Sequence, residues 1–304
     1  MQIGYRWHSL LRYLSQGFLS FLRRPRLRHR IYLFGLKRRP RPSLAAIKDD
    51  LPVDVVIPVI EQDLATLPMV IEGARRNIAH QVGNIFIVGP ENAKIRDKCE
   101  EHACIFVNED TILPIKKRDI SLRPNGVDRS GWIFQQLLKL SADSLSSCEH
   151  ILILDADTVL IRPQRFVLYG QPIYRISDEL HLPYFRNISL LTGREIHPRF
   201  SFVAHHMLFD KSGLVELRNF IEKRNNGPWY EEILRSISLA ESSGFSEYEL
   251  FGHFISQYRS NCLIEYWDNR ALTRNMLGSL DALERLYVHR YKSVSFHWYM
   301  SQPG

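Results

Sequence analysis

The run of residues 151–161 constrains the fold of this chain more than any other stretch. It begins with four aliphatic residues, Ile151 to Leu154, and such a run is typical of a strand buried on both faces in a parallel sheet. Asp155 and Asp157 follow it directly. Because ligands of open α/β sheets bind beyond the carboxyl ends of the strands, we expect these two carboxylates to border a binding site.

Two carboxylates separated by one small residue suit a divalent cation, since Mg²⁺ and Mn²⁺ prefer oxygen ligands. A cation held there can bind a diphosphate and stabilise the charge of a leaving group. The alternative is an ordinary turn, because Asp is a common turn residue. The buried strand in front of Asp155 and Asp157 favours the binding site.

Strand and helix patterns alternate from about residue 51 onward, which predicts an α/β domain with a mostly parallel central sheet flanked by helices. We expect a single domain over residues 51–304, because a chain of 304 residues can bury one large core. The predicted strands are 53–59, 84–89, 104–107, 151–154, 202–210, 262–266 and 294–298. The predicted helices are 64–78, a polar segment ending near 98, 130–140, 211–223, 229–240 and 246–258.

Residues 1–50 form a separate basic arm. All 33 Asp and Glu residues lie beyond residue 48, whereas residues 1–48 contain 12 of the 40 Lys and Arg residues, so the remainder has a formal net charge of −5. Apolar residues recur at steps of three and four between Trp7 and Leu22, which predicts an amphipathic helix. A dense basic run follows, from Arg23 to Arg41.

A basic amphipathic helix with aromatic side chains suits an anionic membrane surface. The four cysteines show no C-x-x-C spacing and indicate reduced thiols, so we expect a cytoplasmic protein, peripheral on the inner face of the cell membrane. The apolar stretch is too short for a secretory signal or a spanning helix. The alternative is that this helix packs on the domain. Nucleic acid is not the expected partner, because the arm has no recognition motif.

Several motifs together resemble a glycosyltransferase of the GT-A type. They are Val-Val-Ile-Pro-Val at 55–59, Gly-Trp followed by Gln-Gln-Leu-Leu-Lys-Leu within 131–140, Leu-Asp-Ala-Asp-Thr at 154–158, Ser-Glu-Tyr-Glu at 246–249, and a late histidine, His297. The combination is similar to a bacterial group of that superfamily and covers roughly residues 52 to 300. The resemblance implies a Rossmann-like GT-A fold, transfer of a sugar from a nucleotide-diphosphate donor, and Mn²⁺ or Mg²⁺ as cofactor. The chain contains no P-loop and no Gly-x-Gly-x-x-Gly run that could hold phosphate instead.

The resemblance also implies roles for individual residues. The end of the first strand and the loop after it would hold the nucleotide, at Pro58, Val59 and Glu61. Asp155 would meet the ribose or the metal, and Asp157 would coordinate the metal. His297 would supply a further ligand, although a half-buried core histidine is an equal alternative.

The helix at 130–140 carries Trp132, Gln135, Gln136 and Lys139 along one face. A face that mixes Trp with two amides is less apolar than a core stripe, so we expect it to contact the ligand. The amides would bind a base or sugar, and Lys139 and the preceding Arg129 would bind phosphate.

The neighbours His205 and His206 alternate across their predicted strand, so only one of them can face the cleft, and a structural role for both is favoured.

Inverting transfer needs a carboxylate that takes the proton of the acceptor hydroxyl. Glu247 or Glu249, near a helix start, is the expected base, with Asp210 in reserve. The alternative for the glutamates is compensation of the helix dipole. A retaining reaction would need no such base, and the pair would then bind acceptor. The acceptor itself is expected to be a glycan or glycolipid of the cell surface, an inference from the arm.

Two other functions remain open. The first is a membrane-peripheral scaffold on this fold that has lost catalysis, which the intact aspartate pair argues against. The second is a metal-dependent nucleotidyltransferase, whose second metal would need more carboxylates, such as Glu109 and Asp110.

Overall fold

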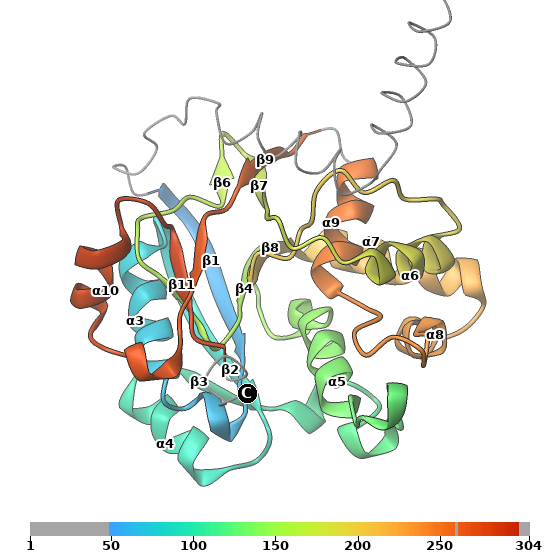
Figure 1. Ribbon diagram of the computed structural model, residues 1–304, viewed down its shortest axis with the longest axis horizontal. Coiled ribbons are helices and arrows are strands. Elements are labelled where there is room, and N and C mark those ends of the chain that lie inside the picture. The colour runs from blue at the N-terminus through green and yellow to red at the C-terminus, as the bar shows by residue number, and fades with distance from the viewer. Residues whose placement is uncertain (1–48, 259–260, 298–304) are drawn as a thin grey trace, which may run out of the picture.

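The computed structural model describes residues 49–258 and 261–297, and these confirm an α/β fold with a mostly parallel central sheet flanked by helices (Figure 1). The five strands of this sheet lie in the order β3-β2-β1-β4-β8. The first four are parallel and β8 is antiparallel to β4. Their bounds are β1 Asp49–Pro58, β2 His80–Gly89, β3 Ile105–Asn108, β4 His150–Leu154 and β8 His206–Asp210.

Both faces of the sheet are buried, and β4 shows why its sequence is aliphatic throughout. Ile151 and Ile153 belong to the core on one face, whereas Leu152 and Leu154 belong to the core on the other. The four side chains are all fully buried. β4 is therefore a central strand as expected, with a parallel neighbour on one side and an antiparallel neighbour on the other.

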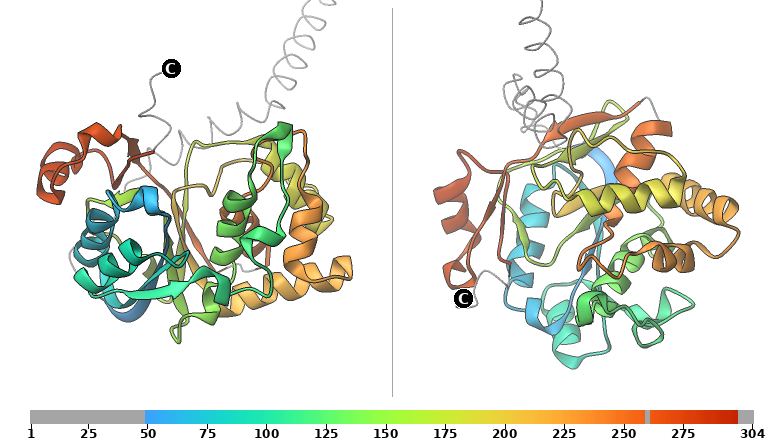
Figure 2. Two further views of the ribbon diagram at one scale, coloured as in Figure 1. Left: turned by 90° about the horizontal axis from the view of Figure 1, so that it is seen from below. Right: turned by 45° about the vertical axis from the view of Figure 1, so that its right-hand side comes forward.

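Helices cover the two faces in separate groups (Figure 1). One face packs against α3 Leu67–Asn77, α4 Ala93–Glu101 and α10 Leu280–Tyr287. The other packs against α5 Ser130–Lys139, α6 Leu182–Thr192, α7 Lys211–Asn225, α8 Trp229–Ser236 and α9 Glu247–Tyr258. Figure 2 shows the second group from further directions, around α5. The predicted helices correspond to α3, α4, α5, α7, α8 and α9, while α6 and α10 were not predicted.

Two small sheets extend the fold. One joins β10 Asn269–Ala271, β11 Ser293–Ser295 and β5 Thr158–Leu160, and the other joins β6 Val167–Leu168, β7 Gln171–Ile176 and β9 Leu263–Tyr266. Because β11 runs antiparallel to β5, it brings the C-terminal part of the chain to the turn that follows β4. Short 3₁₀ helices include η1 Glu61–Asp63 and η6 Arg274–Met276.

The strand expected at 202–210 is shorter than predicted. It begins only at His206, because His205 takes the left-handed backbone conformation with φ of 60°. A non-glycine residue in that region is uncommon and often marks a functional or strained site.

The amphipathic helix expected in the N-terminal arm lies outside the described residues. Among residues 49–258 and 261–297, no helix has the length and apolar character needed to cross a membrane.

Candidate active site

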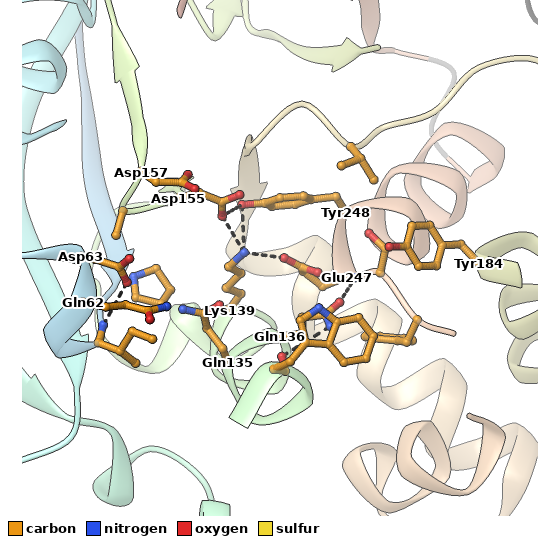
Figure 3. Close-up of a pocket in the computed structure, with 17 residues that line it drawn as sticks. Gln62, Asp63, Gln135, Gln136, Lys139, Asp155, Asp157, Tyr184, Glu247 and Tyr248 are labelled. Atoms are coloured by element: carbon orange, nitrogen blue, oxygen red, sulfur yellow. Dashed lines mark hydrogen bonds and ion pairs between the residues drawn. The ribbon is translucent and has the colours of Figure 1, made fainter. Parts of the chain in front are cut away.

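A cleft with a cavity volume of about 270 Å³ lies at the carboxyl ends of β1 and β4 (Figure 3). It is lined from several directions by strand ends and by the starts and faces of helices. The residues expected from the sequence that line it are Pro58, Trp132, Gln135, Gln136, Lys139, Asp155, Asp157 and Glu247. The structure therefore brings the aspartate pair, the polar face of α5 and the start of α9 to one place.

Lys139 lies at the centre of the cleft wall and joins two carboxylates. Its Nζ is 2.7 Å from Asp155 Oδ1 and 2.7 Å from Glu247 Oε1. The hydroxyl of Tyr248 also donates to Asp155 Oδ1, at 2.7 Å. The side chains of Lys139 and Glu247 are 6% and 4% exposed, so these charges interact with little screening by water.

Burial and charge act against each other in this cluster. Burial alone would lower the pKa of Lys139, but Asp155 and Glu247 raise it above its usual range. Burial would raise the pKa of Asp155, but Lys139 and His205 hold it well below its usual range. For Glu247, burial dominates and raises the pKa in spite of Lys139. Lys139 is thus a permanent cation that keeps Asp155 ionised.

The rings of His205 and His206 point to different partners, that of His205 to Asp155 and that of His206 to Trp267. The ring of His205 lies between Glu179, at 2.9 Å, and Asp155 Oδ2, at 3.6 Å. Burial disfavours its charge, but Asp155 and Glu179 raise the pKa of His205 to about 10. His206 packs against the ring of Trp267 at 4.1 Å between centroids, and burial lowers its pKa to about 3. Only one of the two points toward the aspartates, as the sequence predicted, but the reason is the left-handed turn at His205.

Asp157 lies beside a histidine that comes 140 residues later in the chain. Its Oδ2 is 2.9 Å from Nδ1 of His297, and its carbonyl accepts a hydrogen bond from Phe296 N. Two further bonds hold the turn after β4: Thr158 N donates to Asp155 O, and Thr66 Oγ1 donates to Ala156 O. The turn is therefore fixed by the N-cap of α3 and by the residue that follows β11.

Asp63 is a cleft residue that the sequence analysis missed. It is 9% exposed and lines the cleft, whereas Glu61 is exposed and pairs with Lys94 on the outer surface. Burial raises the pKa of Asp63 to about 6, and the charge of Asp157 contributes to the rise. Arg274 donates to Asp63 Oδ1 at 3.3 Å and to Gln62 O at 2.6 Å, and so connects η6 to η1.

The residues present fit a partial site for Mg²⁺ or Mn²⁺. Asp157 and His297 offer one oxygen and one nitrogen within a hydrogen-bond distance of each other. Within the described part of the chain, no three His, Cys, Asp or Glu side chains are grouped closely enough to hold a metal by themselves. Mg²⁺ usually takes one or two protein ligands and completes its shell with water and substrate phosphates, so two protein ligands are sufficient.

The two aspartates differ in their surroundings. Asp155 Oδ1 accepts hydrogen bonds from Lys139 and Tyr248, and Oδ2 faces the cationic His205. A divalent cation on Asp155 would therefore meet two neighbouring positive charges. The Asp157 carboxylate contacts His297 and Thr158, and within the described part of the chain no Lys or Arg is hydrogen-bonded to it.

Two of the residues expected to bind nucleotide or phosphate lie away from the cleft. Val59 is buried, and its N–H donates to Val88 O. Arg129 stacks over the ring of Trp132 at 4.6 Å and supports the cleft wall from behind. Val59, Glu61 and Arg129 therefore do not line the cleft, in contrast to the expectation from the sequence. Of the residues expected at the end of the first strand, Pro58 lines it.

Two of the three expected bases also lie elsewhere. Glu249 is fully buried and accepts hydrogen bonds from Ser201 Oγ and Phe202 N, so it holds the chain before β8. Asp210 pairs with His150 at the start of β4, at the opposite end of the strand from Asp155, and caps α7 by accepting from Gly213 N. The structure therefore leaves Glu247 as the one of these three carboxylates that lines the cleft.

The further carboxylates expected for a second metal are also distant. Glu109 and Asp110 belong to the 3₁₀ turn after β3, and Asp110 lies 3.8 Å from Lys116. Neither lines the cleft.

Besides Asp63, the cleft contains Gln62, Tyr184, Phe245 and Tyr248, which the sequence analysis did not select. Tyr248 lies between Glu247 and Glu249, both of which were candidate site residues, so its position in the first turn of α9 could have identified it. Tyr184 gave none, because α6 was not predicted.

Residues 53–296 match the model of DUF6492, described as a family of unknown function. Among curated proteins, none matches this chain. Similar solved structures include the galactosyltransferase LgtC in complex with donor and acceptor sugar analogues, at 11% identity, with 81% of this chain and 87% of that chain covered and a TM-score of 0.42. An active-site mutant of LgtC is similar at 12% identity, with the same coverage and TM-score. At such low sequence identity and TM-score, neither a site nor an activity of LgtC can be assigned to this chain. Because the family model spans most of the sequence, the chain belongs to the DUF6492 family.

Proposed function

We propose that this protein is a metal-dependent glycosyltransferase, which transfers a sugar from a nucleotide-diphosphate donor to an acceptor hydroxyl. The observation that carries the proposal is that Asp157, which contacts His297, lines the same cleft as Glu247. A site for a cation and a site for a base thus lie together at the carboxyl ends of β1 and β4, where ligands of α/β sheets bind.

The donor would lie on the side of the cleft that contains Asp157. We assign Mn²⁺ or Mg²⁺ to Asp157 and His297, with water and the diphosphate as the remaining ligands. When bound, the cation supplies Lewis-acid stabilisation of the departing nucleoside diphosphate. Gln135 and Gln62 offer amide groups to the base or the sugar, as their place in the cleft allows. The amide oxygen of Gln136 instead accepts a hydrogen bond from Glu247 N at 3.2 Å and holds the start of α9.

Lys139 is assigned a different role from the phosphate contact expected from the sequence. Both short contacts of its ammonium go to protein carboxylates, Asp155 and Glu247. It therefore positions Glu247, and Asp155 positions Lys139 in turn. We assign Asp155 to this network and the cation to Asp157.

Glu247 is the proposed base of an inverting reaction. Burial raises its pKa, and a carboxylate with a raised pKa takes a proton more readily than an exposed one. The acceptor oxygen would attack the anomeric carbon as Glu247 removes the hydroxyl proton. If the products retain the donor's configuration, Glu247 would bind the acceptor instead, and analysis of the product's anomeric form separates the two.

The direct test is release of nucleoside diphosphate from a panel of nucleotide sugars by the purified full-length protein with Mn²⁺. We expect release from one donor, abolished by a chelator and by Asp157→Asn. No release and no nucleotide-dependent thermal shift for any donor would contradict the proposal and favour a scaffold without catalysis.

A nucleotidyltransferase is the second candidate, because Asp63 adds a third carboxylate near Asp157 in the cleft. Such an enzyme releases pyrophosphate, whereas a glycosyltransferase releases nucleoside diphosphate. The same reaction mixtures therefore decide between the two.

The arm of residues 1–48 would hold the protein at the inner face of the cell membrane, near a glycan or glycolipid acceptor. Its excess of basic residues supports this assignment. Deleting residues 1–48 should abolish sedimentation with anionic liposomes at low salt. Sedimentation of the truncated protein to the same extent would contradict it.

A further inference from the structure

Aromatic residues from three parts of the chain line the cleft. Trp132 comes from α5, Tyr184 from α6 and Phe245 from the segment before α9, and we call these three the aromatic wall. In Figure 3, Gln62 and Asp63 lie on one side of Lys139, and Glu247 and Tyr184 lie on the other. Phe245 is fully buried, whereas Trp132 and Tyr184 are partly exposed, so these two rings present a surface to a ligand.

Arg129, His181 and Ser243 support two rings of the aromatic wall. The guanidinium of Arg129 lies 4.6 Å from the ring of Trp132 and donates to Ser243 Oγ at 3.2 Å. The ring of His181 lies 4.6 Å from that of Tyr184, edge to face, and its Nε2 is 2.7 Å from Ser243 O. Ser243 thus connects the supports of two rings that belong to different helices. A ring held in this way loses little freedom when it binds a ligand.

The charges of the cleft restrict what can bind beside these rings. Four of the residues that line it are acidic: Asp63, Asp155, Asp157 and Glu247. Among the described lining residues, Lys139 is the one Lys or Arg, and its ammonium is bound to two of these carboxylates. His205 and Arg274, which lie outside the lining, each contact one of these carboxylates, so four acidic side chains meet three cations. The remaining negative charge disfavours an anionic ligand that brings no cation of its own.

We propose that the aromatic wall is the acceptor subsite and that it binds a neutral pyranose. The C–H face of such a ring packs on an aromatic face, while its hydroxyls need acceptors such as the Glu247 carboxylate, and the wall and Glu247 offer both together. Glu247 removes the proton of the attacking hydroxyl, whose oxygen bonds to the anomeric carbon of the donor. The bond from that carbon to the diphosphate oxygen breaks, and the diphosphate keeps the electron pair. This subsite rests on the proposed function, because only a transferase needs an acceptor.

Binding can be tested without donor or turnover. Ligand-observed NMR of the full-length protein would be recorded with methyl glycosides of glucose, galactose and N-acetylglucosamine as neutral probes, and with glucuronic acid and glucose 6-phosphate as anionic ones. We expect at least one neutral glycoside to bind and the two anions not to bind. Trp132→Ala and Tyr184→Ala should each weaken that binding about tenfold, the order of a lost ring contact.

The controls separate the ring from general damage to the fold. Tyr184→Phe keeps the ring and should keep the binding. Tyr169→Ala removes a tyrosine that is 91% exposed, outside the cleft, and should change nothing. Thermal unfolding of each variant shows whether it is folded.

The outcomes distinguish this proposal from the proposed function. If a donor is hydrolysed but no neutral glycoside binds, the transferase stands and the acceptor subsite is wrong. If glycosides bind and both Ala variants bind as well as the unaltered protein, the aromatic wall is not the subsite. Anionic sugars that bind as well as neutral ones would overturn the assignment of a neutral acceptor. If glycosides bind as expected but no donor is ever hydrolysed, the wall stands as a carbohydrate site and the transferase fails.

Discussion

The two sides of the cleft are built in different ways. The carboxylate side depends on strand ends and on contacts between distant parts of the chain, such as the 2.9 Å pairing of Asp157 with His297. The aromatic side depends on the packing of α5, α6 and the start of α9, with Ser243 as a common support. The aspartates of the carboxylate side follow a strand of a sheet that is buried on both faces. Trp132 and Tyr184 of the aromatic side belong to helices that cover one of these faces. We infer that the first is suited to holding a cation rigidly and the second to recognising the shape of a partner.

Lys139 lies between the two sides and is bonded to both. One carboxylate partner, Asp155, follows β4, and the other, Glu247, begins α9. The network therefore connects the proposed donor side with the proposed base. Substitutions on the carboxylate side should therefore change cation binding, and those on the aromatic side should change acceptor binding.

The largest effect is expected from Asp157→Asn, which keeps the shape of the side chain and removes its charge. Loss of a cation that contributes several kcal/mol should lower donor hydrolysis about 10³-fold. Titration of Mn²⁺ in the presence of nucleoside diphosphate should show a matching loss of affinity. Glu61→Gln, a matched change on the exposed surface, should leave both unchanged. Equal losses in the two variants would show that Asp157 holds no cation.

The next effect concerns the centre of the cleft. Lys139→Met leaves Asp155 and Glu247 buried without their common cation, and should lower the free energy of unfolding by about 3 kcal/mol. Chemical denaturation at neutral pH measures this. Lys94→Met removes an exposed cation whose pairing with Glu61 is at the surface, and should cost less than about 1 kcal/mol. If Lys139→Met is as mild as Lys94→Met, the central network does not connect the two sides.

A smaller, pH-dependent effect is expected at Asp63. Burial raises its pKa from 3.8 to about 6, so the folded protein holds this proton more tightly than the unfolded chain. Its contribution to stability is complete below pH about 4 and is lost as the pH rises through about 6. With chelator present, Asp63→Asn should therefore be more stable than the unaltered protein well above pH 6, by about 3 kcal/mol, and close to it near pH 4. A constant difference across this range would argue against a buried, titrating Asp63.

The smallest effect is expected from Ser243→Ala on the aromatic side. It removes the hydrogen bond from Arg129 but keeps the backbone oxygen that His181 contacts. The KM for a glycoside acceptor should rise about threefold at unchanged kcat, as for one hydrogen bond lost behind a ring. Ser242→Ala, at the exposed neighbouring position, is the matched control. A fall in kcat without a change in KM would place Ser243 in the chemistry and not in acceptor binding.

Much of the fold could be predicted because it depends on local patterns. The aliphatic run of β4 and the alternation of strands with helices follow from burial on two faces, which is visible residue by residue. The polar face of α5 was visible for the same reason, since Trp132, Gln135, Gln136 and Lys139 recur at helical spacing and all line the cleft. Elements without such a pattern, such as α6, were missed.

The candidate site could be located from the sequence but not assembled. Glu61 and Asp63 both belong to η1, and the choice between them depends on Arg274, which is 211 residues away from Asp63. Asp210 looked like a reserve base, yet the antiparallel direction of β8 places it at the far end of β4. A strand pattern carries no information about the direction in which the strand joins its neighbour.

The sequence by itself determined that a buried strand ends in two aspartates and that a helix with an amphipathic, amide-bearing face precedes it. Only the tertiary structure decided the contacts of each aspartate. Asp155 is bound by Lys139, Tyr248 and His205, whereas Asp157 contacts His297. The physical reason is that local patterns report which side chains become buried. The charge and the hydrogen-bond partners that a carboxylate meets there come from residues separated from it by tens to more than a hundred positions in the chain.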